Sequence, residues 1–355
     1  MENIIINETP VRTSKNFRIN NIEIDSKEIP EKIGKFKNIY TSCETAKDSI
    51  SFEASKPVLK FGLGNVLTNQ AINDKNKEVR IEVQSRTDKN ISVDFIFNKA
   101  NKQLVENIEI IAKENTKSTI IIKYQSEDET KSYHNGIITL KAHENAEVDI
   151  VIINFLNKKS CSFLSIENSI YANSKVKYTI IDFGGKLSIS NYYSNIIGEN
   201  ASNNLNTIYI GNEKQIFDFN YIGELYGEKS NIDIEVQGAL KDSASKRFKG
   251  TIDFKKGCKK AKGNENESCM LLSDKAKSLA LPMLLCSEED VEGNHSSSSG
   301  KVGEKELFYI MTRGFDKTQA EKLLVRARFN SIISEIADEK IREEILEQID
   351  NKLEQ

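Results

Sequence analysis

The sequence repeats a strand pattern at a nearly constant interval, and this interval constrains the fold more than any single motif does. Val148 and Val176 lie 28 residues apart, and Ile120 lies 28 residues before Val148. The series continues at about the same spacing at Ile91, Leu205 and Ile232, and a second strand falls near the middle of the intervals at Phe163, Ile189 and Phe217. Such an interval indicates a solenoid in which each unit buries its apolar face against the next unit.

The strands themselves alternate apolar and polar residues, are rich in β-branched side chains and show no helical periodicity. We therefore predict a mainly β protein whose core, residues 77–302, is a parallel β-helix. A β-sandwich also supplies many short strands, but it does not require a constant period, so it stands as the less favoured alternative.

The two ends of the chain differ from this core. Residues 1–76 lack periodicity, and we predict an irregular N-terminal cap with a short helix that starts near Pro30, since proline is tolerated at a first helical position. Residues 303–355 are predicted to be helical. The helix 304–313 has acids in its first turn and Gly314 just past its end.

Two more helices are predicted in this C-terminal segment. Asp316 and Gln319 resemble a capping box, and the apolar residues behind them follow helical spacing as far as Ile336. An acidic, amphipathic helix follows Ala337 and is predicted to pack on the preceding helix or on a partner.

Composition excludes several classes of protein. Lys and Arg number 50 against 53 Asp and Glu, and this near-balance argues against nucleic-acid binding. The longest apolar-rich run, 148–156, is too short to span a membrane. No signal peptide is visible, and five scattered cysteines suit a reducing, cytoplasmic location. A basic stretch, 241–262, carries nine Lys and Arg against two Asp, and we interpret it as the solvated outer face of strands.

Motifs for nucleotide or ester hydrolysis are absent from the sequence. Six residues separate Gly293 from Gly300 where a P-loop needs four, and Val302 replaces the Ser or Thr that binds magnesium. No Gly-x-Ser-x-Gly nucleophile elbow surrounds the many serines. The fold alone would also allow a carbohydrate-active β-helix enzyme, but the chain has few aromatic residues for sugar stacking.

A few residues have side chains suited to iron. His295 follows the apolar strand 282–286 in what reads as a polar turn, and its imidazole suits iron binding or proton transfer near neutral pH. Cys258 and Cys269 flank a lysine-rich segment, and either offers a thiolate to iron. Cys286, in the apolar strand, is predicted to be buried. We interpret His134 and His143 as surface residues without a functional role.

An ordered set of short motifs resembles one known family. Leu272-Ser273-Asp274-Lys275-Ala276, Pro282, His295, Gly303, Leu307-Phe308-Tyr309, Arg313-Gly314 and Ala320 to Leu324 are similar in order and spacing to the SufB/SufD proteins, scaffold subunits of the SUF iron–sulfur cluster assembly machinery. The clear match spans the last third of the chain, and Thr9 to Thr13 is a weaker echo.

The subfamily is inferred by elimination. SufB-like members follow the motif histidine with Glu, where this chain has Ser296. SufD-like members usually place Cys two residues before the histidine and Gly after it, where this chain has Gly293 and Ser296. The chain is therefore most like SufD. The SufB-like cluster cysteine would align near Glu267, two positions from Cys269.

The resemblance implies a fold, a role and partners. It implies a right-handed parallel β-helix and a non-enzymatic scaffold that pairs with a SufB-like subunit and a SufC-like ABC ATPase; a SufB-like homodimer is the alternative. It places His295 at the subunit interface where the cluster is built, with iron or a cluster bound only transiently and no tightly bound cofactor. It places the ATPase on the C-terminal helices, where Leu323, Leu324 and Phe329 are predicted to form or support the contact surface.

Overall fold

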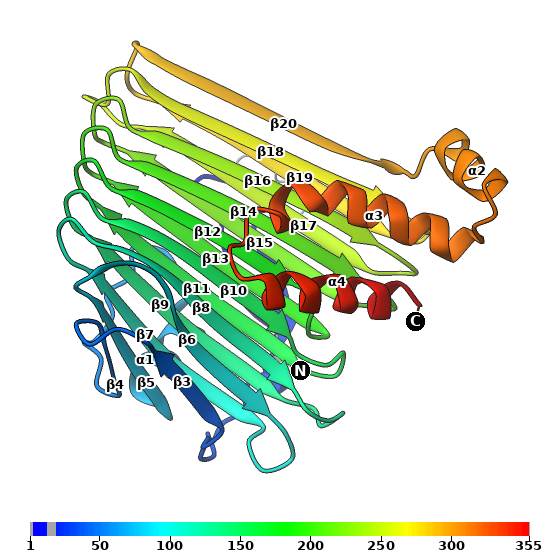
Figure 1. The fold of residues 1–355 in the computed structure, drawn as a ribbon, viewed down its shortest axis with the longest axis horizontal. Helices are drawn as coiled ribbons and strands as arrows, with labels where there is room; N and C mark the ends of the chain where they lie inside the picture. The colour runs from blue at the N-terminus through cyan, green and yellow to red at the C-terminus, as the bar shows by residue number, and fades with distance from the viewer. Residues whose placement is uncertain (1–2, 13–18, 355) are drawn as a thin grey trace.

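The computed structural model describes residues 3–12 and 19–354, and its main body is a parallel β-helix (Figure 1). Within these residues two nine-stranded sheets face each other, in the orders β20-β18-β16-β14-β12-β10-β8-β6-β3 and β19-β17-β15-β13-β11-β9-β7-β5-β4. We call them the even sheet and the odd sheet. The predicted fold class, mainly β with a parallel β-helix and C-terminal helices, is confirmed.

The strands of the β-helix run from residue 77 to residue 301. Their bounds are β5 Lys77–Val83, β6 Arg86–Phe97, β7 Gln103–Ala112, β8 Lys117–Ser126, β9 Tyr133–Ala142, β10 Glu147–Phe155, β11 Cys161–Ile170, β12 Lys175–Asp182, β13 Leu187–Ile196, β14 Ser202–Gly211, β15 Ile216–Leu225, β16 Asn231–Leu240, β17 Ser245–Phe254, β18 Ala261–Leu271, β19 Lys277–Cys286 and β20 Val291–Lys301.

The strand register confirms the repeat and corrects its regularity. Val148 pairs with Val176 as predicted, but Ile120 pairs with Ile150 rather than with Val148. Paired residues lie 26 positions apart between β11 and β13 and 32 apart between β17 and β19. Strand pairing constrains only the strands, so the interval between paired residues varies with the length of the turns that connect them.

Alternation along each strand fills the interior of the β-helix. One buried cluster extends from Val79 in the first turn to Ala276 near the last. Its aromatic rings pack along the axis: Tyr178 meets Tyr192 edge-on at 5.2 Å, and Phe219 stacks on Tyr221 at 5.7 Å. Each such buried side chain contributes about 1.5–3 kcal/mol, and this stacked core holds successive turns in register.

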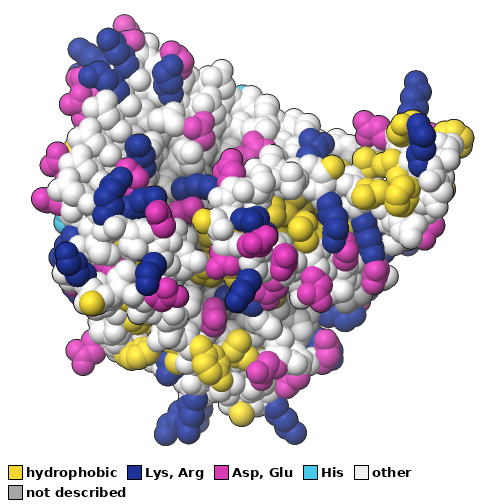
Figure 2. Space-filling view, viewed as in Figure 1, with side chains coloured by type: hydrophobic (Ala, Val, Ile, Leu, Met, Phe, Trp, Pro, Cys, Tyr) yellow, Lys and Arg dark blue, Asp and Glu magenta, His cyan; other side chains and the backbone are white. Residues whose placement is uncertain are grey.

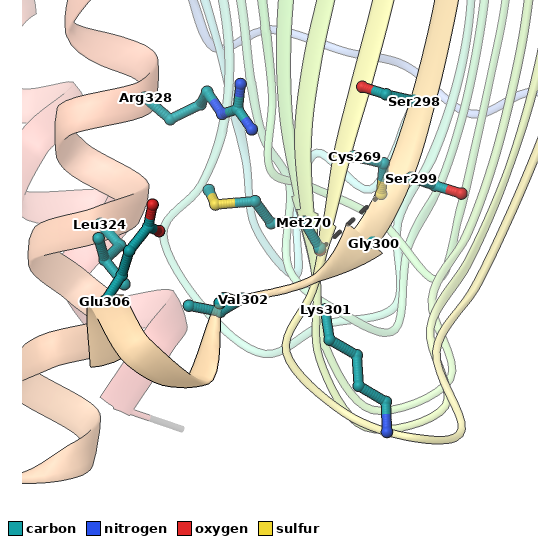
Figure 3. Close-up of a pocket in the computed structure, with 11 residues that line it drawn as sticks. Cys269, Met270, Ser298, Ser299, Gly300, Lys301, Val302, Glu306, Leu324 and Arg328 are labelled. Atoms are coloured by element: carbon teal, nitrogen blue, oxygen red, sulfur yellow. Dashed lines mark hydrogen bonds between the residues drawn. The ribbon is translucent and has the colours of Figure 1, made fainter. Parts of the chain in front are cut away.

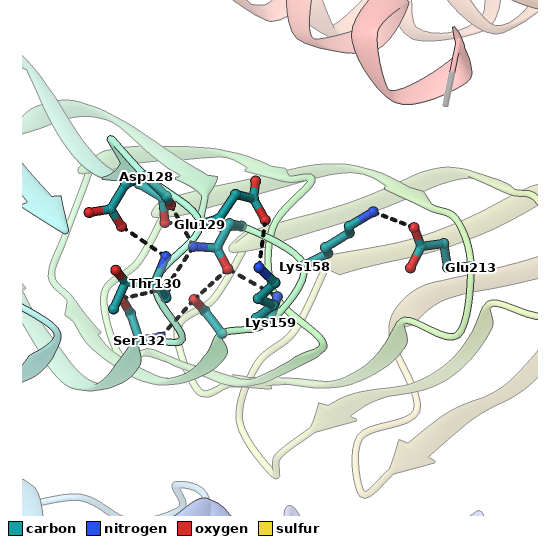
Figure 4. A network of polar contacts seen from close by, with 10 residues as sticks. Asp128, Glu129, Thr130, Ser132, Lys158, Lys159 and Glu213 are labelled. Carbon is teal, nitrogen blue, oxygen red and sulfur yellow. Dashed lines mark hydrogen bonds and ion pairs between the residues drawn. The ribbon is translucent and has the colours of Figure 1, made fainter. Parts of the chain in front are cut away.

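The turns at the edges of the β-helix are linked by polar contacts (Figure 4). Lys158 forms an ion pair with Glu213 at 2.5 Å, and Lys159 forms one with Glu129 at 3.3 Å. Both pairs are exposed, so each adds little stability. On the opposite edge, successive turns place asparagines in the left-handed conformation, which their short polar side chain tolerates, at Asn115, Asn145, Asn173 and Asn200.

The N-terminal residues form a strap along the outer face of the odd sheet. Its elements are β1 Asn3–Ile6, β2 Ile22–Asp25 and α1 Asn65–Asn73, which pack on that face. Between β2 and α1 the chain contributes β3 Ile39–Cys43 to the even sheet and β4 Ser49–Ser51 to the odd sheet. β3 and β4 pair antiparallel with β6 and β5 and cover the first turn. The predicted helix near Pro30 is wrong, because only a 3-10 turn, Ser26–Glu28, precedes it. Thr13, the last residue of the weak N-terminal motif, lies outside the described residues.

The three predicted C-terminal helices are confirmed as α2 Glu304–Thr312, α3 Lys317–Ile333 and α4 Glu339–Glu354. The capping box is present, with the Gln319 amide donating to Asp316 Oδ1 at 2.8 Å. α3 and α4 lie across the outer face of the even sheet, whereas α2 projects beyond it (Figure 1). Phe329 and Ile345 are buried there against sheet residues such as Ile153.

The basic stretch 241–262 is only partly a solvated face, which corrects our interpretation. Lys246 points into the β-helix and forms a fully buried ion pair with Glu267. Lys249 lies on the outer face of the odd sheet, where it pairs with Asp218 at 2.5 Å and donates to the carbonyl oxygen of Asn7 at 2.8 Å. The strap therefore covers a charged pair. Within the described residues, no helix has the length and apolar character needed to cross a membrane.

Candidate functional site at the open end of the β-helix

The last strand leaves the β-helix open at its C-terminal end. In the described chain β20 pairs with β18 on one side only, and its side chains are exposed except for partly buried Val291 (Figure 1). An unpaired strand edge offers backbone donors and acceptors to another chain. The open end is therefore a surface on which a further strand or subunit can dock.

His295 lies in the middle of β20 rather than in a turn, which corrects the prediction. Its register partner is Glu265 on β18. Ser297, two residues on, donates to the buried Glu267 at 2.8 Å, so His295 shares the inward-facing side of the strand. It is exposed because no turn of the β-helix lies above it. The polar sequence around it favours a turn on local propensity, because asparagine is a weak strand former.

Polar ladders on the outer face hold this sequence in the strand. Asn294 donates to Asn264 Oδ1 at 3.0 Å, and Ser296 donates to Asn266 Oδ1 at 2.5 Å. Asn264 donates in turn to an acid on β16, Asp233, at 2.7 Å. These side-chain bonds stabilise the strand conformation of β20, whose residues have a low strand propensity of their own.

A buried ion pair lies beneath the open end. Lys246 and Glu267 are both fully buried and bonded to each other, and Glu267 also accepts from Ser297. The Lys246 ammonium lies 6.0 Å from the Tyr209 ring centre and 5.9 Å from that of Phe248, where the ring faces attract a cation. The interior just below His295 therefore holds a charged pair, whereas Asn168 and Asn203, polar side chains inside the middle turns, are neutral and accept from tyrosine hydroxyl groups.

Glu265 has no such partner. It is 2% exposed, and neither of its carboxylate oxygens has a hydrogen-bond partner among the described residues. Burial, reinforced by the charge of Glu267, raises the pKa of Glu265 to about 8. Glu265 is not among the site residues predicted from the sequence. The signal that could have found it is that an acid occupies a position whose side chain, by the alternation along the strand, points into the β-helix.

The cysteines predicted as iron ligands are buried. Cys269 points inward on β18, and burial raises the pKa of its thiol, with Lys246 opposing the shift. Cys258 lies in the turn before β18, and burial raises the pKa of its thiol to about 11. Across residues 3–12 and 19–354, no group of three or more His, Cys, Asp or Glu side chains is placed to hold a metal ion. Iron binding by either cysteine stays a prediction.

Cys286, predicted to be buried, is exposed. It ends β19, the last strand of the odd sheet, so no further turn covers its inward face. Its thiol donates to the carbonyl oxygen of Glu288 at 2.9 Å. An apolar strand normally implies burial, but at the end of a solenoid that burial requires a next repeat or a partner.

His134 is also not a surface residue. It is fully buried, with Nε2 2.9 Å from Glu106 Oε1 and Nδ1 2.9 Å from Ser162 Oγ. Tyr124 donates to the same Glu106 oxygen at 2.8 Å. The cluster lies in the early turns, away from the open end. His143 is partly buried and its ring stacks on Tyr171 at 5.6 Å.

A cavity of about 530 Å³ joins the open end to the helices (Figure 3). It lies where β18 and β20 end against α2 and α3, and its lining includes Cys269, Met270, Glu306, Leu324 and Arg328. The structure thus brings Cys269, a predicted iron ligand, and Leu324, a predicted residue of the partner surface, to one cavity.

An exposed apolar patch covers α2 and the start of α3 (Figure 2). Its most exposed members are Phe308 at 70% and Tyr309 at 59%, with Leu323 at 41%. Leu324 is partly buried and Phe329 is fully buried against the even sheet. Of the three residues predicted to form or support a partner surface, Leu323 is placed to touch a partner and Phe329 is placed only to support α3.

The family is decided by comparison with known proteins. The family model described as SUF system FeS cluster assembly, SufBD core domain, matches residues 95–328, from β6 to α3. The chain belongs to the SufBD family. This match includes the open end of the β-helix and confirms the resemblance seen in the motifs.

Individual SufBD relatives agree with this membership. The chain is 25% identical to the iron–sulfur cluster assembly protein SufD of Bacillus subtilis over 79% of this chain and 62% of that protein. It is 26% identical to a SufBD family protein of Pyrococcus horikoshii over 70% of this chain and 56% of that protein. The chain thus spans about three fifths of the length of these curated relatives. Within the family it is most like SufD.

Proposed function

We propose that this chain is a non-enzymatic, SufD-like scaffold subunit on which iron–sulfur clusters are assembled together with other SUF proteins. The observation that carries the proposal is the unpaired outer edge of β20, a strand that presents the family's motif histidine, His295, on its inward face. Membership of the SufBD family supports the scaffold role. Iron and sulfur are cargo here, bound transiently at the interface and not retained as a cofactor.

The proposed partner at the open end is a SufB-like subunit. Docking on the β20 edge would supply the missing strand pairing and would cover Cys286 and the inward face around His295. In this arrangement the partner contributes the thiolate and carboxylate ligands, and His295 faces them across the interface. A second copy of this chain is the alternative occupant, as in a SufB-like homodimer.

The proposed partner at the helices is a SufC-like ABC ATPase. The exposed apolar patch includes Phe308 and Met311, which stand at i and i+3 on α2, and Leu323 on α3. Exposed apolar residues at helical spacing are of the kind that seat a helix in a partner groove. The sequence has no P-loop, so nucleotide hydrolysis is assigned to that partner. Deletion of residues 304–355 is an unsuitable test, because α3 and α4 cover an apolar face of the even sheet.

Point variants test the ATPase surface instead. Phe308→Ala combined with Leu323→Ala should abolish capture of the ATPase in a pull-down. Leu279→Ala is the matched control, because Leu279 is 42% exposed on β19 and lies outside the patch. Equal capture by both variants would reject the helices as the docking surface.

Complementation tests the role of the open end. In a strain that lacks the native gene, His295→Ala should fail to restore iron–sulfur enzyme activities, whereas His143→Ala should restore them. The control histidine lies outside the open end and stacks on Tyr171. Full restoration by His295→Ala would show that His295 is only a surface residue.

A further inference from the structure

Residues 54–63, which we call the covering segment, cross the outer face of the odd sheet without pairing to it. They lie between β4 and α1 and form neither strand nor helix. Within the described chain, no backbone-to-backbone hydrogen bond joins them to a strand of that sheet. The segment is therefore attached to the sheet through side-chain contacts.

Three acids on the outer face of the odd sheet receive the covering segment. Glu109 on β7 accepts from the Ser55 amide at 3.0 Å, and Glu167 on β11 accepts from the Lys60 amide at 2.7 Å. The Lys60 ammonium forms an ion pair with Glu224 on β15. Hydrogen bonds to an ionised group are stronger than those between neutral groups, so the acids are the main anchors of the segment.

An aromatic residue on β13 completes the contact. The Phe61 ring meets the Tyr193 ring edge-on at 5.0 Å, and the Lys60 ammonium lies 5.4 Å from the centre of the same Tyr193 ring. A tyrosine ring attracts a cation. The sheet therefore contacts Lys60 and Phe61 together, as a basic residue followed by an aromatic one. We call the four side chains that hold the segment the receiving face: Glu109, Glu167, Tyr193 and Glu224.

The receiving face is held in place by the β-helix itself. Glu224 is 4% exposed, accepts from the Tyr193 hydroxyl at 2.6 Å and pairs with Lys255 at 3.1 Å. Glu109 pairs with Arg80 at 3.0 Å. None of these contacts involves the covering segment, so these side chains keep their arrangement when the segment leaves. A site that is preorganised in this way loses less conformational freedom when it binds a ligand.

The middle of the covering segment is open to solvent. Val58, between the two contact points at Ser55 and Lys60, is 85% exposed, and the Lys60 side chain is 46% exposed. Loops with few buried contacts open at a low cost in free energy. The segment can therefore lift from the receiving face while the β-helix stays folded.

We propose that the receiving face is a peptide-binding site, which the covering segment occupies in the isolated chain and from which a partner protein displaces it. The partner supplies an extended stretch of the same chemistry, a lysine followed by an aromatic residue. Charge complementarity supports this occupant, since the three acids of the face match a basic stretch. The face lies on the odd sheet, whereas α3 and α4 cover the even sheet, so this inference does not rest on the proposed function.

A fluorescent synthetic peptide of residues 54–63 is the probe, and fluorescence anisotropy with the full chain measures its binding. Lys60→Ala combined with Phe61→Ala in the chain weakens the covering segment. This double variant should bind the peptide at least about tenfold more tightly than the unmodified chain, where the segment competes at an effective concentration on the order of millimolar. A peptide that carries the same two substitutions should bind the double variant at least about tenfold more weakly.

Variants of the two sheets locate the site. Glu224→Gln, added to the double variant, should weaken peptide binding at least about tenfold, because it removes the charge that pairs with Lys60. Glu235→Gln is the matched control and should leave binding unchanged. Glu235 lies on the outer face of the even sheet, where it accepts from Asn266 at 2.7 Å.

Three results would overturn the proposal. One is no binding of millimolar peptide by a double variant whose circular dichroism spectrum is unchanged, and another is equal binding of the two peptides. The third is a dimer of the unmodified chain that Glu224→Gln abolishes, seen by size-exclusion chromatography, because it would make a second copy the occupant. If the double variant fails to fold, hydrogen exchange of the unmodified chain decides: millimolar peptide should speed exchange in proteolytic fragments that contain residues 54–63, and unchanged exchange would reject the site.

Discussion

The buried ion pair between Lys246 and Glu267 permits a quantitative prediction about stability. Both side chains are fully buried, and Lys246→Met would leave Glu267 with a single donor, Ser297. Removing one partner of a buried pair typically costs about 3–5 kcal/mol. Protonation of the abandoned Glu267 carboxylate limits this cost. An ordinary glutamate has a pKa of about 4.3, so pH 7 lies about 2.7 units above it; at about 1.4 kcal/mol per unit, protonation then costs about 3.7 kcal/mol.

The expected loss for Lys246→Met is therefore about 3–4 kcal/mol at pH 7 and about 1 kcal/mol at pH 5, where protonation is easier. Urea unfolding followed by far-ultraviolet circular dichroism measures it, since the chain has no tryptophan. Lys262→Met is the control: Lys262 pairs with Glu292 at 2.9 Å, but both side chains are more than half exposed, so the loss should stay under about 0.5 kcal/mol. Equal losses in the two variants would refute the reasoning, and so would a Lys246→Met penalty that does not fall with pH.

Three further predictions use other residues. Burial raises the pKa of Asp182 to about 6, so the folded state holds its proton more tightly than the unfolded state; stability should fall by up to about 3 kcal/mol between pH 4 and pH 6, and Asp182→Asn should flatten this slope in unfolding measured across pH. Gly238→Ala should cost about 3 kcal/mol of unfolding free energy because its Cβ would lie 1.9 Å from the Tyr209 ring, whereas Gly300→Ala, with open space around it, should cost under about 1 kcal/mol; similar melting temperatures would contradict this. His295→Ala should change stability by no more than about 0.5 kcal/mol while it impairs cluster assembly, and a large loss of stability would indicate a structural role instead.

The sequence predicted the solenoid because its physical cause is local and repeated. Alternating apolar residues at a regular interval require stacked strands, and the pairing of Val148 with Val176 follows directly. The C-terminal helices were equally predictable, since the capping box of Asp316 and Gln319 and the glycine at 314 are short-range signals.

The parts that escaped prediction depend on contacts between distant residues. Local propensity predicts a turn at His295, whereas side-chain ladders to β18 hold this segment in a strand. The apolar sequence around Cys286 predicts burial, because a sequence does not show after which repeat a solenoid ends. The strap could not be foreseen either, because Asn7 contacts Asp218 and Lys249, more than 200 positions away.

The inward acid Glu265 illustrates the same limit at the candidate site. Strand alternation alone gives its direction, but its missing partner emerges only when Lys246 is seen to be bonded to Glu267. Equally, the three residues predicted on α3 follow one helical pattern, yet Leu323 is exposed and Phe329 is buried, because the sheet beneath the helix decides which face is covered.

Affinity purification of the tagged full chain from its native cells, with the recovered chains identified by mass spectrometry, tests the central claim most directly. We predict that a SufB-like subunit and a SufC-like ATPase are recovered with it in comparable amounts. Recovery of neither SUF protein would contradict the scaffold role proposed for the open end and the helices.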